Sequence, residues 1–321
     1  MKISRFAARG VLGLRDLDLD FAAGSSGASA GPRDVVIVSG PPASGKTRLF
    51  DLMLAALEAV GPYHGMVRAS DWCADLGKGA RVELGLFVEG SVEGSVEGSP
   101  EGAAERAVVD FTADGVLTAV DRRVAKLVSR YDHDPAHGKR EYFPEGRQRA
   151  WGARCDGLGE LEQSLLRSTK DAQKYSFVPR FLAELRHDAR RRATFARQLE
   201  LLSPSVRFAA APRQDPTACF KNRMREEVPF VELSSSESEA VIIAATATLV
   251  GLHRSVIFLD RPELYVSSDR LAEFVEALLQ LGEQNQWFIA TSDRNLAASL
   301  PRAHHVSLGS GAAQPALGRP H

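Results

Sequence analysis

Short runs of apolar residues, rich in β-branched side chains, recur along the chain and are bounded by small or polar residues. Runs of this length and composition are typical of strands that are buried on both faces. They occupy residues 35–38, 256–259, 287–291 and 304–308. A looser alternation of apolar and polar positions over residues 1–21 predicts two antiparallel strands at the start of the chain.

Helical periodicity separates these strands. Apolar residues recur at helical spacing over residues 48–60, 158–202, 240–252 and 268–281. Strands that alternate with helices predict an α/β fold, in which a mainly parallel sheet carries helices on both faces. We expect the antiparallel strands to precede this sheet and the long helical segment to form an insert.

Two further segments define the expected domain organisation. Residues 81–111 are typical of a hairpin, and its connecting loop at residues 89–105 repeats the letters Val-Glu-Gly-Ser. Such repeats usually form mobile loops, although an acidic recognition segment is the alternative. We predict a single domain over residues 1–308, with a helical insert at residues 158–202, and a disordered tail over residues 309–321.

The overall composition narrows the class of protein. The chain has 321 residues, of which 44% are hydrophobic and 25% charged, as in ordinary soluble globular proteins. A formal net charge of −1 excludes a global field that would attract nucleic acid or an anionic membrane. The three scattered cysteines and the lack of an apolar leader or a membrane-length apolar run predict a cytoplasmic protein with no membrane contact.

The most specific motif is the sequence GPPASGKT, which matches a phosphate-binding loop and lies between a predicted strand and a predicted helix. In this setting the backbone N–H groups and the helix N-terminus face the phosphates. The lysine pairs with the outer phosphates, and the threonine hydroxyl reaches Mg²⁺. We predict a site for ATP and Mg²⁺ with contacts from Gly40, Ser44, Gly45, Lys46, Thr47 and Arg48.

A second nucleotide motif lies in the second half of the chain. The apolar run at residues 256–259 is followed directly by Asp260. This is the Walker B pattern, in which a carboxylate at the end of a buried strand holds Mg²⁺. We therefore expect Asp260 and Thr47 to be the two metal ligands.

The order of the motifs resembles one superfamily of nucleotide-binding proteins. The phosphate loop is followed by a helical insert, the sequence LSSSESE at residues 233–239, the Walker B strand and the tripeptide PEL at residues 262–264. This order resembles the ATP-binding-cassette ATPase head, within it the soluble branch of RecF, SMC and OLD-like proteins. The resemblance implies two heads that associate head to tail and close ATP sites at their interface, as a homodimer or a heteromer.

The serine-rich segment has two interpretations. The resemblance implies that Ser234, Ser235 and Ser236 contact the γ-phosphate that the opposite head holds. Alternatively, serines and acidic residues in front of an apolar helix simply cap its N-terminus. The neighbouring nucleotide motifs favour the first interpretation.

Three departures from the family pattern all affect hydrolysis. Arg261 follows the Walker B aspartate where the family has the glutamate that polarises water, and arginine cannot accept a proton. Ser292 and Asp293 stand where a histidine is expected, and Ser236 stands where a glycine is expected. We therefore predict that ATP is bound but hydrolysed slowly or not at all.

Other routes to hydrolysis stay open. An active ATPase is the first alternative, with Asp260 and Glu263 as its catalytic residues or with groups supplied by a partner subunit. A scaffold with a vestigial ATP site is the second. For the glutamine that the family places near the metal, Gln148 is the nearest candidate.

The resemblance implies a protein in which bound nucleotide gates association. Its expected setting is DNA maintenance or defence against phage, together with an effector protein. A basic stretch could contact nucleic acid, or it could be a solvated helix face. Its basic residues are Arg186, Arg190, Arg191, Arg192 and Arg197.

Overall fold

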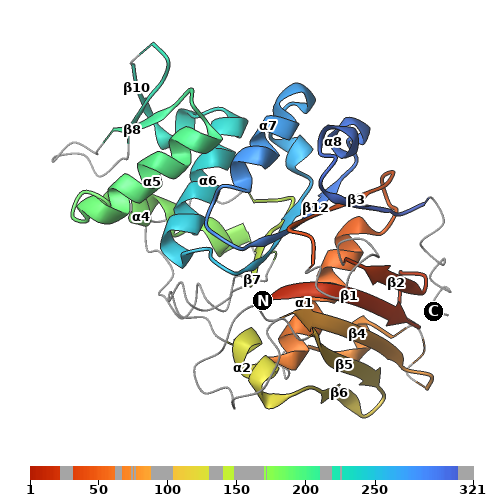
Figure 1. Ribbon diagram of the computed structural model, residues 1–321. Helices are drawn as coiled ribbons and strands as arrows, with labels where there is room; N and C mark the ends of the chain where they lie inside the picture. Colours follow the sequence, from red (N-terminus) through yellow and green to blue (C-terminus); the bar gives the residue numbers. More distant parts are fainter. Residues whose placement is uncertain are drawn as a thin grey trace, which may run out of the picture.

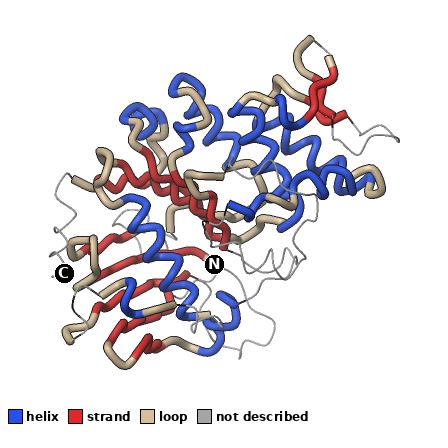
Figure 2. The backbone as a smooth tube through the Cα atoms, turned by 180° about the vertical axis from the view of Figure 1, so that it is seen from behind, coloured by secondary structure: helices blue, strands red, loops and turns tan. Residues whose placement is uncertain are grey.

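In the computed structural model the strands and helices form stacked layers, which Figures 1 and 2 show from opposite sides. The structure describes residues 1–21, 32–61, 67–73, 75, 77–87, 104–129, 140–147, 170, 172–209, 219–224 and 226–309. Most of the predicted loop at residues 89–105, the first part of the predicted insert, Gln148 and the tail from residue 310 lie outside this part of the chain.

The strands are β1 (Lys2–Arg9), β2 (Leu17–Asp20), β3 (Val35–Ser39), β4 (Ala80–Phe87), β5 (Ala104–Thr112), β6 (Gly115–Ala119), β7 (Arg140–Phe143), β8 (Arg207–Ala209), β9 (Cys219–Lys221), β10 (Glu227–Pro229), β11 (Val256–Asp260), β12 (Gln286–Thr291) and β13 (His304–Ser307). The helices are α1 (Lys46–Val60), α2 (Arg122–Ser129), α4 (Val178–Glu184), α5 (Ala189–Leu202), α6 (Ser235–Val250), α7 (Ser268–Leu278) and α8 (Arg294–Ser299).

The central layer is a parallel sheet with the strand order β13-β3-β12-β11-β7. Its inner strands are buried on both faces, which explains their continuous apolar sequences. Successive residues point to opposite faces. Val36 and Phe258 join the hydrophobic core that contains α1, whereas Ile37 and Leu259 join the core that contains α6. The sheet therefore separates two cores.

An antiparallel sheet with the order β2-β1-β4-β5-β6 forms a second layer. Helix α1 packs between the two sheets, and its Leu49 and Phe50 are fully buried there. The predicted α/β class and its N-terminal antiparallel strands are confirmed. The strands β4 and β5 of the predicted hairpin extend that pair, so the antiparallel part is a complete sheet.

The side chain of Gln286 links the two sheets. Its Oε1 accepts a hydrogen bond from the N–H of Ile3 at 2.6 Å, and its Nε2 donates to the carbonyl oxygen of Ile3 at 2.8 Å. Nε2 also donates to the carbonyl oxygen of Arg33 at 3.1 Å. The side-chain amide thus offers β1 the donor and acceptor of a peptide group, which accounts for a fully buried glutamine at this position.

Helices α4, α5, α6 and α7 cover the other face of the parallel sheet (Figure 1). The sequence predicted one uninterrupted helical segment through the basic stretch. In the structure the helix is interrupted by a turn, because α4 ends at Glu184 and α5 begins at Ala189. Asp188 starts α5 as its N-cap, because its side chain accepts a hydrogen bond from the N–H of Arg191 at 2.8 Å. None of the described helices is long and apolar enough to cross a membrane.

Candidate nucleotide-binding site

The loop between β3 and α1 has the backbone of a phosphate cradle. A Cβ atom on Gly40 would lie 2.5 Å from both the carbonyl oxygen of Leu308 and Ser44 Oγ, so only glycine fits there. Gly45 precedes α1 with a left-handed backbone at φ 93°, a conformation that favours glycine. The N-terminus of α1 therefore opens directly onto the loop, where its N–H groups favour an anion.

Lys46 lies against the loop that precedes it. Its Nζ donates hydrogen bonds to the carbonyl oxygens of Gly40 at 2.7 Å and Pro41 at 2.9 Å. Burial lowers the pKa of Lys46, while the neighbouring charge of Glu263 raises it and that of Arg261 lowers it. The ammonium group is thus held by neutral carbonyls, which the oxygens of a phosphate could replace.

Thr47 and Asp260 meet at the carboxyl end of the parallel sheet. Thr47 Oγ1 donates to Asp260 Oδ2 at 2.7 Å, and the hydroxyl of Tyr142 donates to the same oxygen at 3.4 Å. Asp260 is completely buried, and burial raises the pKa of its carboxyl group. Its Oδ1 has no hydrogen-bond partner among the described residues. The two predicted metal ligands are therefore adjacent, with one carboxylate oxygen available.

A cavity of about 260 Å³ opens beside the loop. It is lined by residues 42–48 together with Glu145, Arg261 and Ser292. The loop residues predicted to bind ATP, apart from Gly40, all line this cavity. Glu145 was missed by the sequence analysis. It follows β7, the edge strand next to β11, and lines the cavity, whereas the predicted Gln148 lies outside the described residues.

Arg48 makes its contacts with residues outside the phosphate loop. Its guanidinium group donates to the carbonyl oxygens of Leu12 at 3.2 Å and Asp71 at 2.5 Å, and lies over the ring of Trp72 at 4.2 Å. Arg48 therefore joins α1 to the antiparallel sheet region, although part of its side chain lines the cavity.

Arg261 has an unusual backbone and two acidic neighbours. It ends β11 with φ 51° and ψ 59°, a left-handed conformation that is costly for a residue with a side chain. Its Nη1 lies 3.1 Å from Glu145 Oε2, and its Nε lies 3.8 Å from Glu263 Oε1. The guanidinium group therefore stands between two carboxylates at the cavity, and its side chain is 37% exposed.

Glu263 is held by the end of β12. Its Oε2 accepts a hydrogen bond from Thr291 Oγ1 at 3.0 Å, and its Oε1 accepts one from the N–H of Ser292 at 2.9 Å. Its side chain lies outside the cavity lining. Asp293 caps the short helix α8, since its Oδ1 accepts from the N–H groups of Asn295 and Leu296. Ser292 thus lines the cavity, whereas Asp293 has a local structural role.

The serine-rich segment begins α6. Ser234 is the N-cap and forms a reciprocal capping box with Glu237, in which each side chain bonds the backbone N–H of the other residue. Ser234 and Ser235 are exposed. The three serines lie outside the lining of the phosphate-loop cavity in the same chain.

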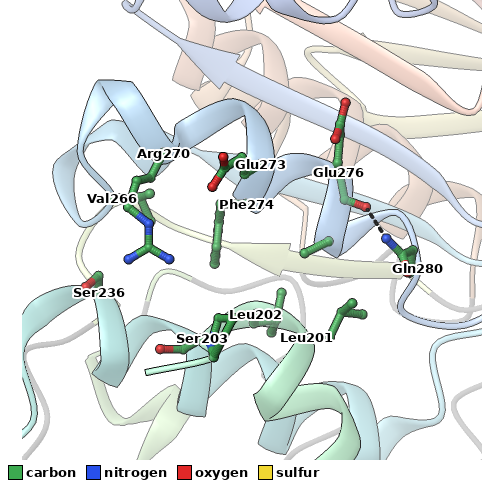
Figure 3. Close-up of a pocket in the computed structure, with 12 residues that line it drawn as sticks. Leu201, Leu202, Ser203, Ser236, Val266, Arg270, Glu273, Phe274, Glu276 and Gln280 are labelled. Atoms are coloured by element: carbon green, nitrogen blue, oxygen red, sulfur yellow. Dashed lines mark hydrogen bonds between the residues drawn. The ribbon is translucent and has the colours of Figure 1, made fainter. Parts of the chain in front are cut away.

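Ser236 instead borders a second cavity of about 290 Å³, which lies between the end of α5, the first turn of α6 and the helix α7 (Figure 3). Arg270 and Phe274 of α7 face it from one side, and Ser203 faces it from the other. Ser236 therefore stands at the junction of the α6 N-terminus with the two helices that cover it.

Arg147 and Glu239 form a buried ion pair that the sequence analysis did not find. Arg147 Nε lies 2.5 Å from Glu239 Oε1, and both side chains have an exposed fraction of 0%. Arg147 Nη1 also donates to the carbonyl oxygens of Pro144 at 2.6 Å and Asp260 at 2.8 Å. One guanidinium group therefore fastens the end of β7 and the Walker B strand to helix α6.

The basic stretch is a mixed surface. Arg186 lies in the turn before α5 and donates to His187 Nε2 at 2.8 Å, and Arg191 pairs with Asp188 at 3.8 Å. Arg190 and Arg197 are exposed on α5, and Arg192 is half-buried. Contact of this surface with nucleic acid stays a prediction, and a solvated helix face stays its alternative.

Solved SMC head domains share this fold. An SMC head domain from Thermotoga maritima aligns with a TM-score of 0.51 and 15% sequence identity, over 96% of this chain and 94% of that chain. An SmcHead bound to the C-winged helix domain of ScpA aligns with a TM-score of 0.55 and 12% identity, over 93% and 92% respectively. Neither a protein-family model nor a curated protein matches the sequence. At this level of identity the likeness establishes a P-loop α/β fold of the SMC-head type.

Proposed function

We propose that this chain binds ATP together with Mg²⁺, and that the bound nucleotide gates its association with a second copy of itself or with a partner head. The observation that carries the proposal is the meeting of Thr47 and Asp260 beside a complete phosphate loop. These two residues are 213 positions apart in the sequence. Their contact at the carboxyl edge of a parallel sheet is where such folds bind nucleotides.

The residues at this point fit a magnesium ion. Mg²⁺ binds oxygen ligands, often one or two from the protein and the rest from phosphates and water. The hydroxyl of Thr47 and the Asp260 Oδ1 atom, which has no hydrogen-bond partner among the described residues, supply such oxygens. Thr47 and Asp260 would hold the ion, and the ion would neutralise charge on the phosphates.

Association through the serine-rich segment is the second part of the proposal. Ser234 and Ser235 are exposed at the N-terminus of α6, and the positive end of a helix dipole favours a phosphate that another head would hold there. Two apolar side chains near these motifs in the sequence are exposed. Val231, which precedes the serine-rich segment, is 73% exposed, and Leu264, which follows the Walker B strand, is 46% exposed. We propose that the second head covers these two side chains.

We propose further that hydrolysis is slow or absent, because Arg261 occupies the position of the expected base. An active ATPase completed by Glu263 or by a partner is the second candidate, and the hydrogen bonds that hold the Glu263 carboxylate beside Ser292 of the cavity lining favour it. DNA maintenance or anti-phage defence with an effector protein is the biological setting we propose. It follows the family resemblance, and the ScpA-bound SmcHead offers a precedent for a protein partner.

Titration of the purified chain with ATP tests the proposal. We expect binding in a calorimeter with Mg²⁺ present, an increase in mass by light scattering in the same sample, and little phosphate release. Removal of Mg²⁺ with EDTA should weaken ATP binding and reverse the mass increase. Absence of ATP binding would instead support the scaffold with a vestigial site, and steady phosphate release would support the active ATPase.

Restoring a carboxylate at position 261 should increase turnover. The variant Arg261→Glu is best made together with Glu145→Gln, because the new carboxylate would otherwise lie close to those of Glu145 and Glu263 and be repelled by both. We expect at least a tenfold higher rate of phosphate release, since a positioned base contributes about 10²–10⁴ in rate. Arg261→Gln in the same background is the control, with a side chain of the same size but no base. Equal rates in the two variants would contradict our interpretation of Arg261.

A further inference from the structure

Arg261 is placed in the candidate site by its backbone. A strand that continued past Asp260 would turn its next side chain to the opposite face. The left-handed conformation ends β11 instead, and the side chain of Arg261 lies in the same cavity as Lys46. Strained backbone of this kind concentrates at functional sites. The hydrogen bond from the N–H of Arg261 to the carbonyl oxygen of Ala290, at 2.9 Å, holds the conformation in place.

The charges around the cavity are unequal. Lys46, Arg48 and Arg261 line it with three cations, and Glu145 is the acidic residue among its described lining residues. Arg48 is engaged by two backbone carbonyls and Trp72, which leaves Lys46 and Arg261 as the cations that face the open volume. The charge of Arg261 is offset by Glu145, whose carboxylate would repel any phosphate that approached it.

The contact between Arg261 and Glu145 is suited to exchange. The Glu145 side chain is 50% exposed, so its carboxylate can turn into solvent. Exposed ion pairs contribute little stability. A phosphate carries more negative charge than one carboxylate, and the planar guanidinium group can bind two of its oxygens at once. The Nε of Arg261 is buried without a hydrogen-bond partner in the described chain, so it is a donor that such a contact would satisfy.

We propose that Arg261 recognises the terminal phosphate of a nucleoside triphosphate by exchanging the Glu145 carboxylate for it, so that the cavity prefers ATP to ADP. The inference rests on the proposed ATP binding. The phosphate loop holds the inner phosphates of either nucleotide, and Lys46 reaches toward the outer ones. Arg261 lines the cavity directly after Asp260, the predicted metal ligand at the end of the Walker B strand, and we place the third phosphate there. The triphosphate therefore gains a contact that the diphosphate lacks.

Dissociation constants for ATP and ADP, measured by calorimetry with Mg²⁺ on the full chain, test the exchange. Arg261→Gln should weaken ATP binding by about tenfold or more and leave ADP binding unchanged. Glu145→Gln should have the opposite effect, with ATP binding tighter by about two- to fivefold and ADP binding unchanged. Arg254→Gln is the matched control, because Arg254 is also left-handed at φ 51° and lies outside the cavity lining.

The outcomes separate this inference from the proposed function. Binding of neither nucleotide by the unmodified chain would overturn both. Binding of ATP and ADP that Arg261→Gln weakens equally, or does not change, would overturn the exchange and leave the proposed function standing. Thermal unfolding of each variant shows whether it is folded. If Arg261→Gln does not fold, Glu145→Gln decides the question alone, and unchanged or weaker ATP binding in that variant overturns the exchange.

Discussion

Replacement of Glu239 by alanine is expected to lower the free energy of unfolding by about 3–5 kcal/mol, because it leaves the charge of Arg147 buried and uncompensated. Both side chains are completely buried, and their closest atoms are 2.5 Å apart. Removing one member of such a pair costs far more than the pair itself contributes. Urea unfolding followed by circular dichroism measures the effect.

Two further variants make this result specific. Glu184→Ala removes one partner of the exposed pair that Arg180 and Glu184 form at 2.8 Å, and should cost less than about 1 kcal/mol. The double variant Arg147→Met/Glu239→Met removes both charges, and should recover part of the loss, since apolar pairs often replace buried ion pairs without penalty. A double variant that is less stable than Glu239→Ala would show that the contacts of Arg147 with backbone carbonyls dominate.

The second large effect is expected at the phosphate loop. Lys46→Ala should weaken ATP binding by roughly 100-fold or more, because loss of one partner of a desolvated charged contact costs about 2–5 kcal/mol. If nucleotide gates association, the same variant should lose the ATP-dependent increase in mass. Calorimetry and light scattering measure the two effects on one sample.

The control for Lys46→Ala is Lys78→Ala, because the Lys78 side chain is 86% exposed and lies outside the cavity lining. It should bind ATP as the unmodified chain does. Association that survives Lys46→Ala would show that the assembly does not depend on nucleotide, and it would favour the scaffold alternative. In this variant the carbonyl oxygens of Gly40 and Pro41 lose their hydrogen bonds from Lys46 Nζ. Thermal unfolding of the variant is therefore measured as well, to show that it is folded.

The sequence predicted those parts of the fold and site that are encoded locally. The strands β3, β11 and β12 are continuous apolar runs because both of their faces are buried. The phosphate loop is a contiguous motif, and Asp260 is marked by the strand that it ends. Each of these signals lies within a few residues, so a pattern of hydrophobic and polar positions is enough to find it.

The parts that were missed depend on pairing between distant segments. The short strand β7 has the sequence REYF, which carries no periodic pattern, and it is defined by its parallel pairing with β11. Glu145 reaches the cavity only because of that pairing. Arg147 and Glu239 are 92 residues apart, and neither is marked as buried by its own neighbours in the sequence. Long-range contacts of this kind leave no local signal.

The serine-rich segment shows a different limit. The sequence left a helix cap and a contact in trans as alternatives, and the structure contains the capping box of Ser234 and Glu237. A cap uses the side chain of Ser234 and the first N–H groups of α6, but Ser235 is exposed beside it. The capping role of Ser234 is therefore confirmed, and the contact in trans stays a prediction that involves other atoms of the same segment.

The link at Gln286 has a consequence for protein engineering. A side-chain amide takes the place of a neighbouring strand, and the antiparallel sheet is further attached to the nucleotide-binding layer by the ion pair of Lys2 with Asp34 and the ring contact of Phe21 with Phe288. A foreign sheet would need a peptide group at the position of Ile3 and an apolar inner surface against α1. The contacts at this boundary are thus what a chimaera must keep when it exchanges the outer sheet and leaves the phosphate loop intact.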